Sequence, residues 1–108
     1  MTEACVVITT CGSEETALTV ASGLVDQGLA ACVNILPTIN SYYYYQGGTH
    51  LDEEVMIIIK TTTELFDQVS QLITDLHTYE VPEILMFPVG GSSAPFLDWL
   101  KQSVTRAD

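Results

Sequence analysis

Basic residues are almost absent from this sequence. Three Lys and Arg stand against fourteen Asp and Glu, which gives a formal charge of −11 at pH 7 over 108 residues. A charge of this sign and size repels polyanions, so nucleic acid and anionic membrane surfaces are excluded as partners. A nucleotide site that needs several cationic side chains is disfavoured for the same reason. Cations are the ligands that the composition favours.

Long apolar runs and cysteine motifs are also missing. No apolar run approaches the roughly 20 residues that span a bilayer, and Glu3 lies where a signal peptide would carry positive charge. We therefore expect a soluble, untargeted, cytoplasmic protein. Cys5, Cys11 and Cys32 match no zinc or redox spacing. We expect three reduced thiols, of which Cys11, at the end of a strand, reacts first.

The sequence does contain a regular succession of strand-like and helix-like segments. Its length fits one domain, which we place at residues 1–108. Gly28 predicts the end of a helix, Pro37 a bend in a strand, and Thr61 with Glu64 a capping box. The expected elements, in order, are strand 4–10, helix 13–27, bent strand 30–46, strand 55–61, helix 63–76, strand 83–89 and a last helix from residue 93.

This order is β-α-β-β-α-β plus a C-terminal helix, an α+β, ferredoxin-like arrangement in which two helices cover one face of a four-stranded sheet. The runs VMIII and ILMF are apolar at successive positions, so both sheet faces should be buried. Because a soluble monomer rarely exposes a large apolar patch, we expect an oligomer. Four tyrosines alternate between the two faces of a projecting hairpin and should pack between subunits: Tyr42, Tyr43, Tyr44 and Tyr45.

Five segments are distinctive together: ITTCGSEETA, LAACVNILPTINSYYYYQGG, EEVMIIIKTT, LHTYEVPEI and FLDWL. In this order and with these gaps they resemble the CutA family of divalent-cation tolerance proteins, along almost the whole chain. The resemblance implies a cytoplasmic homotrimer whose three sheets face one another, related in architecture to the PII-type signalling proteins. It also implies a link to copper tolerance, metal binding in some members and no agreed enzymatic activity. A cysteine proposed as a copper ligand in some members aligns with Thr9.

The segment HTYEVPEI carries the candidate metal site. His77 and Glu80, with Cys11 from the end of the first strand, offer nitrogen, oxygen and sulfur ligands suited to copper or zinc. Because a closed zinc site needs about four ligands, we expect no required cofactor and only weakly bound Cu or Zn. The alternative is structural: His77 ends the second helix, where a hydrogen-bond donor is favoured, and Val81 anchors the loop by burial.

A second candidate site is a small-ligand cleft between subunits. Glu83, at the start of a strand, is expected to pair with Lys60, since a lysine that follows VMIII is costly to bury alone. Tyr79 and Trp99 complete the proposed cleft. Trp99 is also interpreted as the residue that anchors the last helix.

Three classes of function remain open at this stage. The first is a trimeric, non-enzymatic CutA-type protein that binds copper, other divalent cations or a small ligand in a regulatory or homeostatic role. The second is a PII-like sensor of a nucleotide or small molecule, which the scarcity of Lys and Arg opposes. The third is a small hydrolase resembling an acylphosphatase, whose phosphate loop should be basic, whereas this loop reads TCGSEE.

Overall fold

Four strands form one antiparallel sheet in the order β2-β3-β1-β4 in the computed structural model, which describes residues 2–104. The α+β, ferredoxin-like prediction is confirmed. The strands are β1 (Ala4–Cys11), β2 (Cys32–Tyr45), β3 (Gly48–Thr62) and β4 (Leu85–Pro88). The helices are α1 (Glu14–Asp26), α2 (Phe66–Leu76), which follows the short 3-10 turn η1 (Thr63–Leu65), and α3 (Ala94–Val104).

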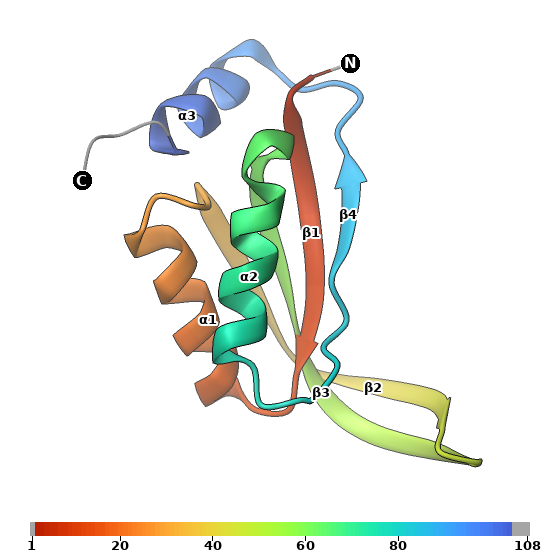
Figure 1. The fold of residues 1–108 in the computed structure, drawn as a ribbon. Helices are drawn as coiled ribbons and strands as arrows, with labels where there is room; N and C mark the ends of the chain where they lie inside the picture. The colour runs from red at the N-terminus through yellow and green to blue at the C-terminus, as the bar shows by residue number, and fades with distance from the viewer. Residues whose placement is uncertain (1, 105–108) are drawn as a thin grey trace.

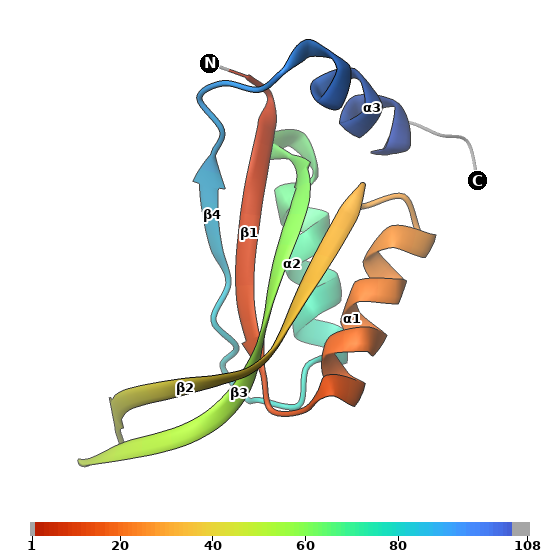
Figure 2. The same cartoon turned by 180° about the vertical axis from the view of Figure 1, so that it is seen from behind.

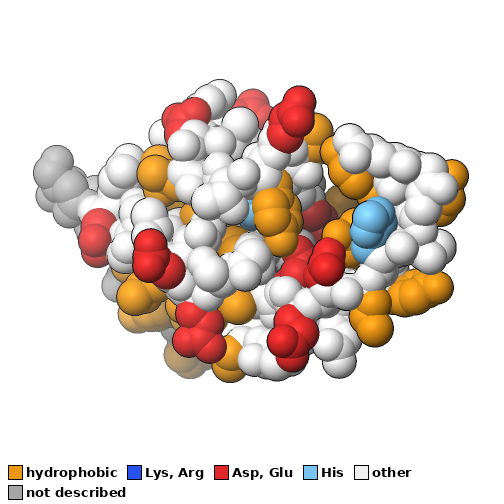
Figure 3. All heavy atoms as spheres, turned by 90° about the horizontal axis from the view of Figure 1, so that it is seen from below, with side chains coloured by type: hydrophobic (Ala, Val, Ile, Leu, Met, Phe, Trp, Pro, Cys, Tyr) orange, Lys and Arg blue, Asp and Glu red, His pale blue; other side chains and the backbone are white. Residues whose placement is uncertain are grey.

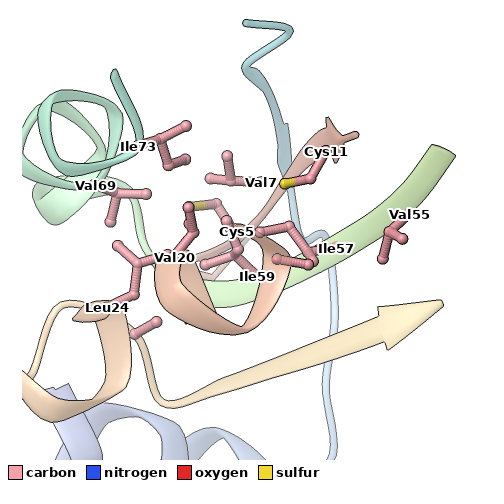
Figure 4. Packing of buried hydrophobic residues seen from close by; sticks show 12 residues of the cluster. Cys5, Val7, Cys11, Val20, Leu24, Val55, Ile57, Ile59, Val69 and Ile73 are labelled. Atoms are coloured by element: carbon pink, nitrogen blue, oxygen red, sulfur yellow. The ribbon is translucent and has the colours of Figure 1, made fainter. Parts of the chain in front are cut away.

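Helices α1 and α2 lie side by side on one face of the sheet, while α3 crosses the end where β1 begins (Figure 1). Alternate strand residues such as Val7, Ile57 and Ile59 are fully buried against Leu24 of α1 and Ile73 of α2 (Figure 4). Every second strand residue therefore packs against the apolar stripes of the two helices, and the core is the single layer between the sheet and these helices.

The ends of α1 follow from local signals in the sequence. The Ser13 hydroxyl oxygen accepts the Thr16 N–H at 3.1 Å, and Glu14 and Glu15 occupy the positive end of the helix dipole. Gly28 follows the helix with φ 72°, a conformation that glycine adopts without steric cost. The predicted helix 13–27 is confirmed to within a residue at each end.

The predicted capping box at the start of α2 is wrong. Thr61 belongs to β3, is fully buried, and donates its hydroxyl to the Leu29 carbonyl at 2.6 Å. Neither η1 nor α2 has a side-chain capping hydrogen bond. The Thr61 hydroxyl is used in a tertiary contact with Leu29, in the turn after α1, and so it does not cap α2 as the local pattern predicted.

The β2–β3 hairpin extends well beyond the rest of the sheet (Figure 2). The register shifts between Leu36 and Ile39, where Pro37 cannot donate to the ladder and Thr38 takes φ 58°. The predicted bend is confirmed, and it turns the outer half of the hairpin away from the sheet. At the tip, Gln46 and Gly47 both have positive φ, as a two-residue type I′ turn requires.

Figure 2 shows that neither α1 nor α2 covers the other face of the sheet. Paired strand positions put seven apolar side chains on it, all partly or well exposed: Val6, Ile8, Leu36, Met56, Ile58, Leu85 and Phe87. The predicted second apolar face is thus present. The oligomer that would cover it stays a prediction.

The segment before β4 is less regular than predicted. β4 spans four residues rather than 83–89, and Val81 is 80% exposed, so Val81 does not anchor this loop. Among residues 2–104, no helix is long and apolar enough to cross a membrane.

Candidate functional site

A groove of about 490 Å³ lies where the hairpin leaves the sheet, at the end of β1. Three segments line it: the end of β1, the hairpin, and the loop from α2 to β4. Among the residues that the structure describes, its lining includes four carboxylates, Asp52, Glu54, Glu80 and Glu83, and no Lys or Arg. Figure 3 shows acidic side chains gathered around this hollow. We call it the acidic groove.

The hairpin supplies two of the carboxylates and two tyrosines. Asp52 and Glu54 are two residues apart on β3, so both face the groove, and the register places Tyr43 and Tyr45 beside them. The Tyr43 hydroxyl donates to Asp52, which raises the pKa of Tyr43. The Tyr43 ring also stacks on His50, with centroids 5.4 Å apart.

Sequence reasoning missed Asp52 and Glu54, because the run LDEE resembles an ordinary solvated stretch. The signal that identifies them is their spacing of two residues, combined with a hairpin register fixed by the turn at Gln46 and Gly47. Counting back from that turn puts both carboxylates on the face that carries Tyr43.

Tyr79 closes the groove from the side of the α2–β4 loop. Its hydroxyl donates to Glu54 Oε2 at 2.6 Å. Its ring packs so close to Gly12 that a Cβ at Gly12 would lie 3.3 Å from the Tyr79 hydroxyl oxygen. Burial, and then the hydrogen bond to Glu54, raise the pKa of Tyr79. Tyr79 therefore remains a protonated donor that fixes the position of the Glu54 carboxylate.

His77 holds the loop against β1. Its main-chain N–H bonds the Ile73 carbonyl at 2.9 Å, so His77 ends α2 as predicted. Its Nε2 lies 2.7 Å from the Thr10 carbonyl oxygen, and its Nδ1 accepts the Tyr79 N–H at 3.0 Å. This pattern assigns the ring proton to Nε2. The imidazole thus joins α2 to β1 and Tyr79, rather than capping helix carbonyls with its side chain.

One chain does not bring His77, Glu80 and Cys11 together as metal ligands. Cys11 has no exposed surface and lies in the core (Figure 4), where burial, and then Glu54, raise the pKa of its thiol. Both ring nitrogens of His77 are already hydrogen-bonded. Within residues 2–104 there is no group of three or more His, Cys, Asp and Glu side chains placed to hold a metal ion. Thr9, which the resemblance aligns with a cysteine proposed as a copper ligand in some members, is fully buried.

The predicted Lys60–Glu83 ion pair is wrong within one chain. Lys60 lies opposite Val6 on β1, whereas Glu83 lines the acidic groove near Thr10, at the other end of that strand. The β1 strand also separates β3 from β4. Of the predicted cleft residues, only Tyr79 and Glu83 share a hollow, so a site that also included Lys60 would need a second subunit.

Trp99 does not anchor α3, since its side chain is 46% exposed. The buried residue of that helix is Leu100, which is 3% exposed. Trp99 instead contacts Phe96, with ring centroids 5.5 Å apart. The pair forms an aromatic surface next to the open sheet face.

The four hairpin tyrosines divide between two faces, as strand alternation predicted. Tyr43 and Tyr45 line the acidic groove. Tyr42 and Tyr44 point the other way and are each 73% exposed, with Leu51 directly paired to Tyr42 and 65% exposed. Their predicted role between subunits remains untested in a single chain.

The chain is similar to proteins of one family along nearly its whole length. A family model described as CutA1 divalent ion tolerance protein matches residues 5–103. The divalent-cation tolerance protein CutA of Thermus thermophilus is 43% identical over 98 residues, which cover 91% of this chain and 95% of that protein. Its solved structure superposes with a TM-score of 0.88, covering 90% of this chain and 94% of that one.

Two further relatives differ in length or in the location that their names give. The chloroplastic protein CutA 1 of Oryza sativa is 38% identical over 102 residues. The aligned residues cover 94% of this chain and 58% of that protein. The structure described as the periplasmic divalent cation tolerance protein CutA of Archaeoglobus fulgidus is 34% identical, with a TM-score of 0.91 over 94% of this chain and 98% of that one.

Proposed function

Since the chain belongs to the family of CutA1 divalent ion tolerance proteins, we propose that it serves divalent-cation tolerance by binding cations reversibly in the acidic groove of a homotrimer. The observation that carries this proposal is the lining of the groove, in which four carboxylates gather with no Lys or Arg from residues 2–104 to neutralise them. In a chain of charge −11, this is a concentrated region of negative potential.

The groove suits weak, reversible binding of copper, zinc or another divalent ion, and not a permanently bound metal cofactor. Two of its carboxylates already accept tyrosine hydroxyls, and residues 2–104 of one chain supply no set of three metal-binding side chains. A bound cation would therefore keep several water ligands. We expect binding with a dissociation constant on the order of 10⁻⁴ M, and a protein that folds without metal.

The homotrimer is the assembly we propose for covering the open sheet face. Leu36, Leu85 and Phe87 on that face and Tyr42 and Tyr44 on the hairpin are exposed apolar side chains, and association would remove such a patch from water. Association of three chains would also bring a neighbour's side chains toward each groove. A regulatory or homeostatic role would then follow from cation occupancy at the contacts between subunits.

A nucleotide-sensing or catalytic role has less support. Among residues 2–104 the groove offers no basic side chain to a phosphate, and the Thermus thermophilus relative is named a tolerance protein rather than an enzyme. A cytoplasmic location stays a prediction, because related proteins carry chloroplastic and periplasmic in their names.

Calorimetric titration of the chelator-treated protein with Zn²⁺ and Cu²⁺ tests the proposal. We expect Glu54→Gln to weaken binding about tenfold, because it removes a groove charge while keeping an acceptor for Tyr79. The matched control is Glu64→Gln, an exposed carboxylate on η1 outside the groove, which should leave binding unchanged.

Two outcomes would count against the acidic groove. Equal weakening by Glu54→Gln and Glu64→Gln would show that the overall charge collects cations without a site. Loss of binding in His77→Ala, with Glu54→Gln unaffected, would move the site to the imidazole.

A further inference from the structure

The sheet face that α1 and α2 leave uncovered carries opposite charges at its two ends. Lys60 lies opposite Val6, near the start of β1, and shares this face with it. The acidic groove begins at Thr10, near the end of the same strand. The rise of a strand puts about 13 Å between Val6 and Thr10. One end of the face is therefore positive and the other end is negative.

Lys60 has no counter-ion within its own chain. Among residues 2–104, its ammonium group lies 5.8 Å from the centroid of the Phe96 ring and forms no ion pair. Lys101, by contrast, pairs with Glu3 at 3.5 Å. Covering a half-buried lysine is costly without a carboxylate, because burial removes the water that solvates its charge. If other subunits cover this face, one of them has to supply the carboxylate.

The acidic groove contains carboxylates without a partner. Asp52 and Glu54 each accept a tyrosine hydroxyl. The side chains of Glu80 and Glu83, on the loop from α2 to β4, form no hydrogen bond or ion pair within residues 2–104. Carboxylates gathered in one groove repel one another, so an ammonium group from outside the chain would lower the energy of the groove.

Other carboxylates are less suitable partners for Lys60. The acidic residues of α1 and α2 lie on the helical side of the sheet (Figure 1), so association through the uncovered face does not bring them to Lys60. The groove includes Thr10, whose side chain belongs to the same sheet face as Val6. The groove is thus both the acidic region on the correct face and the region with free carboxylates.

We propose that Lys60 of each subunit enters the acidic groove of the next subunit and pairs there with the carboxylates of Glu80 and Glu83. This inference rests on the proposed homotrimer. A closed ring of identical chains uses two different surfaces on every chain, one for each neighbour. The two ends of the sheet face form such a complementary pair of surfaces. One ammonium group leaves the groove negative, so the proposed cation binding near Asp52 and Glu54 is retained.

Carbodiimide cross-linking tests this contact, because the reagent joins an amine directly to a carboxylate and adds no spacer. Lys60 and Lys101 are the lysines of the chain, so mass spectrometry of the products identifies which lysine reacted. At low micromolar concentration we expect covalent dimers and trimers in which Lys60 of one chain is joined to Glu80 or Glu83 of another. The Lys101–Glu3 pair should cross-link within one chain and is the internal control.

Matched variants locate the contact. Glu80→Gln/Glu83→Gln keeps the size of both side chains and should lower the yield of covalent dimers and trimers at least about tenfold, the change that corresponds to a lost charge-assisted contact. Glu53→Gln/Glu64→Gln removes the same charge from two exposed positions outside the groove and should cross-link like the wild type.

Two results would overturn the inference while leaving the homotrimer in place. The first is a wild type that is trimeric by light scattering and gives the Lys101–Glu3 product, but no product that joins Lys60 to another chain. The second is an undiminished yield of covalent dimers and trimers from folded Glu80→Gln/Glu83→Gln. A monomeric wild type would instead refute the homotrimer, and this inference with it, whereas the calorimetric test of cation binding would be unaffected.

Discussion

The His77 imidazole offers a direct test of how the acidic groove is held together. Its Nε2 hydrogen donates to the Thr10 carbonyl at 2.7 Å, and its Nδ1 accepts the Tyr79 N–H at 3.0 Å. A hydrogen bond between neutral groups contributes about 1 kcal/mol net to stability. His77→Ala removes both, so we expect the free energy of unfolding to fall by about 2 kcal/mol. A helix-end contact alone would be worth about 1 kcal/mol or less.

A graded pair of substitutions separates the two bonds. His77→Gln keeps an amide N–H that can reach the Thr10 carbonyl but places no acceptor at Nδ1, so it should cost about 1 kcal/mol. Thr78→Ala, at the exposed next position, is the control and should change stability by less than about 0.5 kcal/mol.

The assay is guanidinium unfolding at one fixed protein concentration, because subunit association would make stability depend on concentration. The reasoning is refuted if His77→Ala costs less than about 0.5 kcal/mol, the range of ordinary surface substitutions. Equal losses of unfolding free energy for His77→Ala and His77→Gln would refute the assignment of separate contributions to the Nε2 and Nδ1 hydrogen bonds.

Three further predictions concern the groove, the thiols and the open sheet face. Because burial and Glu54 raise the folded-state pKa of Tyr79, its contribution to stability is complete below the unfolded pKa of about 10 and is lost as the pH rises above it. Tyr79→Phe should therefore remove the last-titrating part of the tyrosinate absorbance, and an unchanged titration curve would contradict this. Half-buried Cys32 should react with a thiol reagent at least about tenfold faster than Cys11, which is fully buried with a raised pKa, and equal rates would disprove this order. Light scattering should give three times the 11.8 kDa chain mass for the wild type and one chain mass for Ile58→Asp, and a trimeric Ile58→Asp would show that the open sheet face does not hold the subunits together.

The expected order of thiol reactivity changes once the strands are placed. Sequence position put Cys11 at the end of a strand and suggested access to solvent. The structure turns it toward the helices, paired with Val55 and buried in the core, while Cys32 lies half-buried on the opposite sheet face, beside Lys60. Which face a strand residue occupies decides its exposure, and one position of difference reverses it.

Elements whose signals are local could be predicted, and those fixed by distant contacts could not. Ser13 and Gly28 set the ends of α1 through their own side chain and backbone, so both ends were found. Thr61 has the same local chemistry as a capping residue. Its hydroxyl instead donates to the Leu29 carbonyl, 32 residues away in sequence, and no local sequence pattern predicts that contact.

The same distinction applies to the candidate sites. The residues of the HTYEVPEI segment were found because His and Glu can bind metal ions or form ion pairs and because the segment resembles a family motif, and Tyr79 and Glu83 do line the groove. Asp52 and Glu54 were missed, since only the hairpin register gives them a common face. Pairing Lys60 with Glu83 rested on charge complementarity alone and took no account of the strand between them.

The arrangement around Glu54 connects the fold to the proposed function. His77 fixes the backbone at Tyr79, Tyr79 fixes one oxygen of Glu54, and a fixed carboxylate loses little freedom when a cation arrives. The same hydrogen bond occupies an oxygen that a tight metal site would use. The fixed position of Glu54 thus raises the affinity for a cation, whereas the shortage of free ligand oxygens lowers it. The net result that we expect is weak, rapidly reversible binding. A protein that responds to a rising cation concentration needs such binding, because a site saturated at low concentration would register no change.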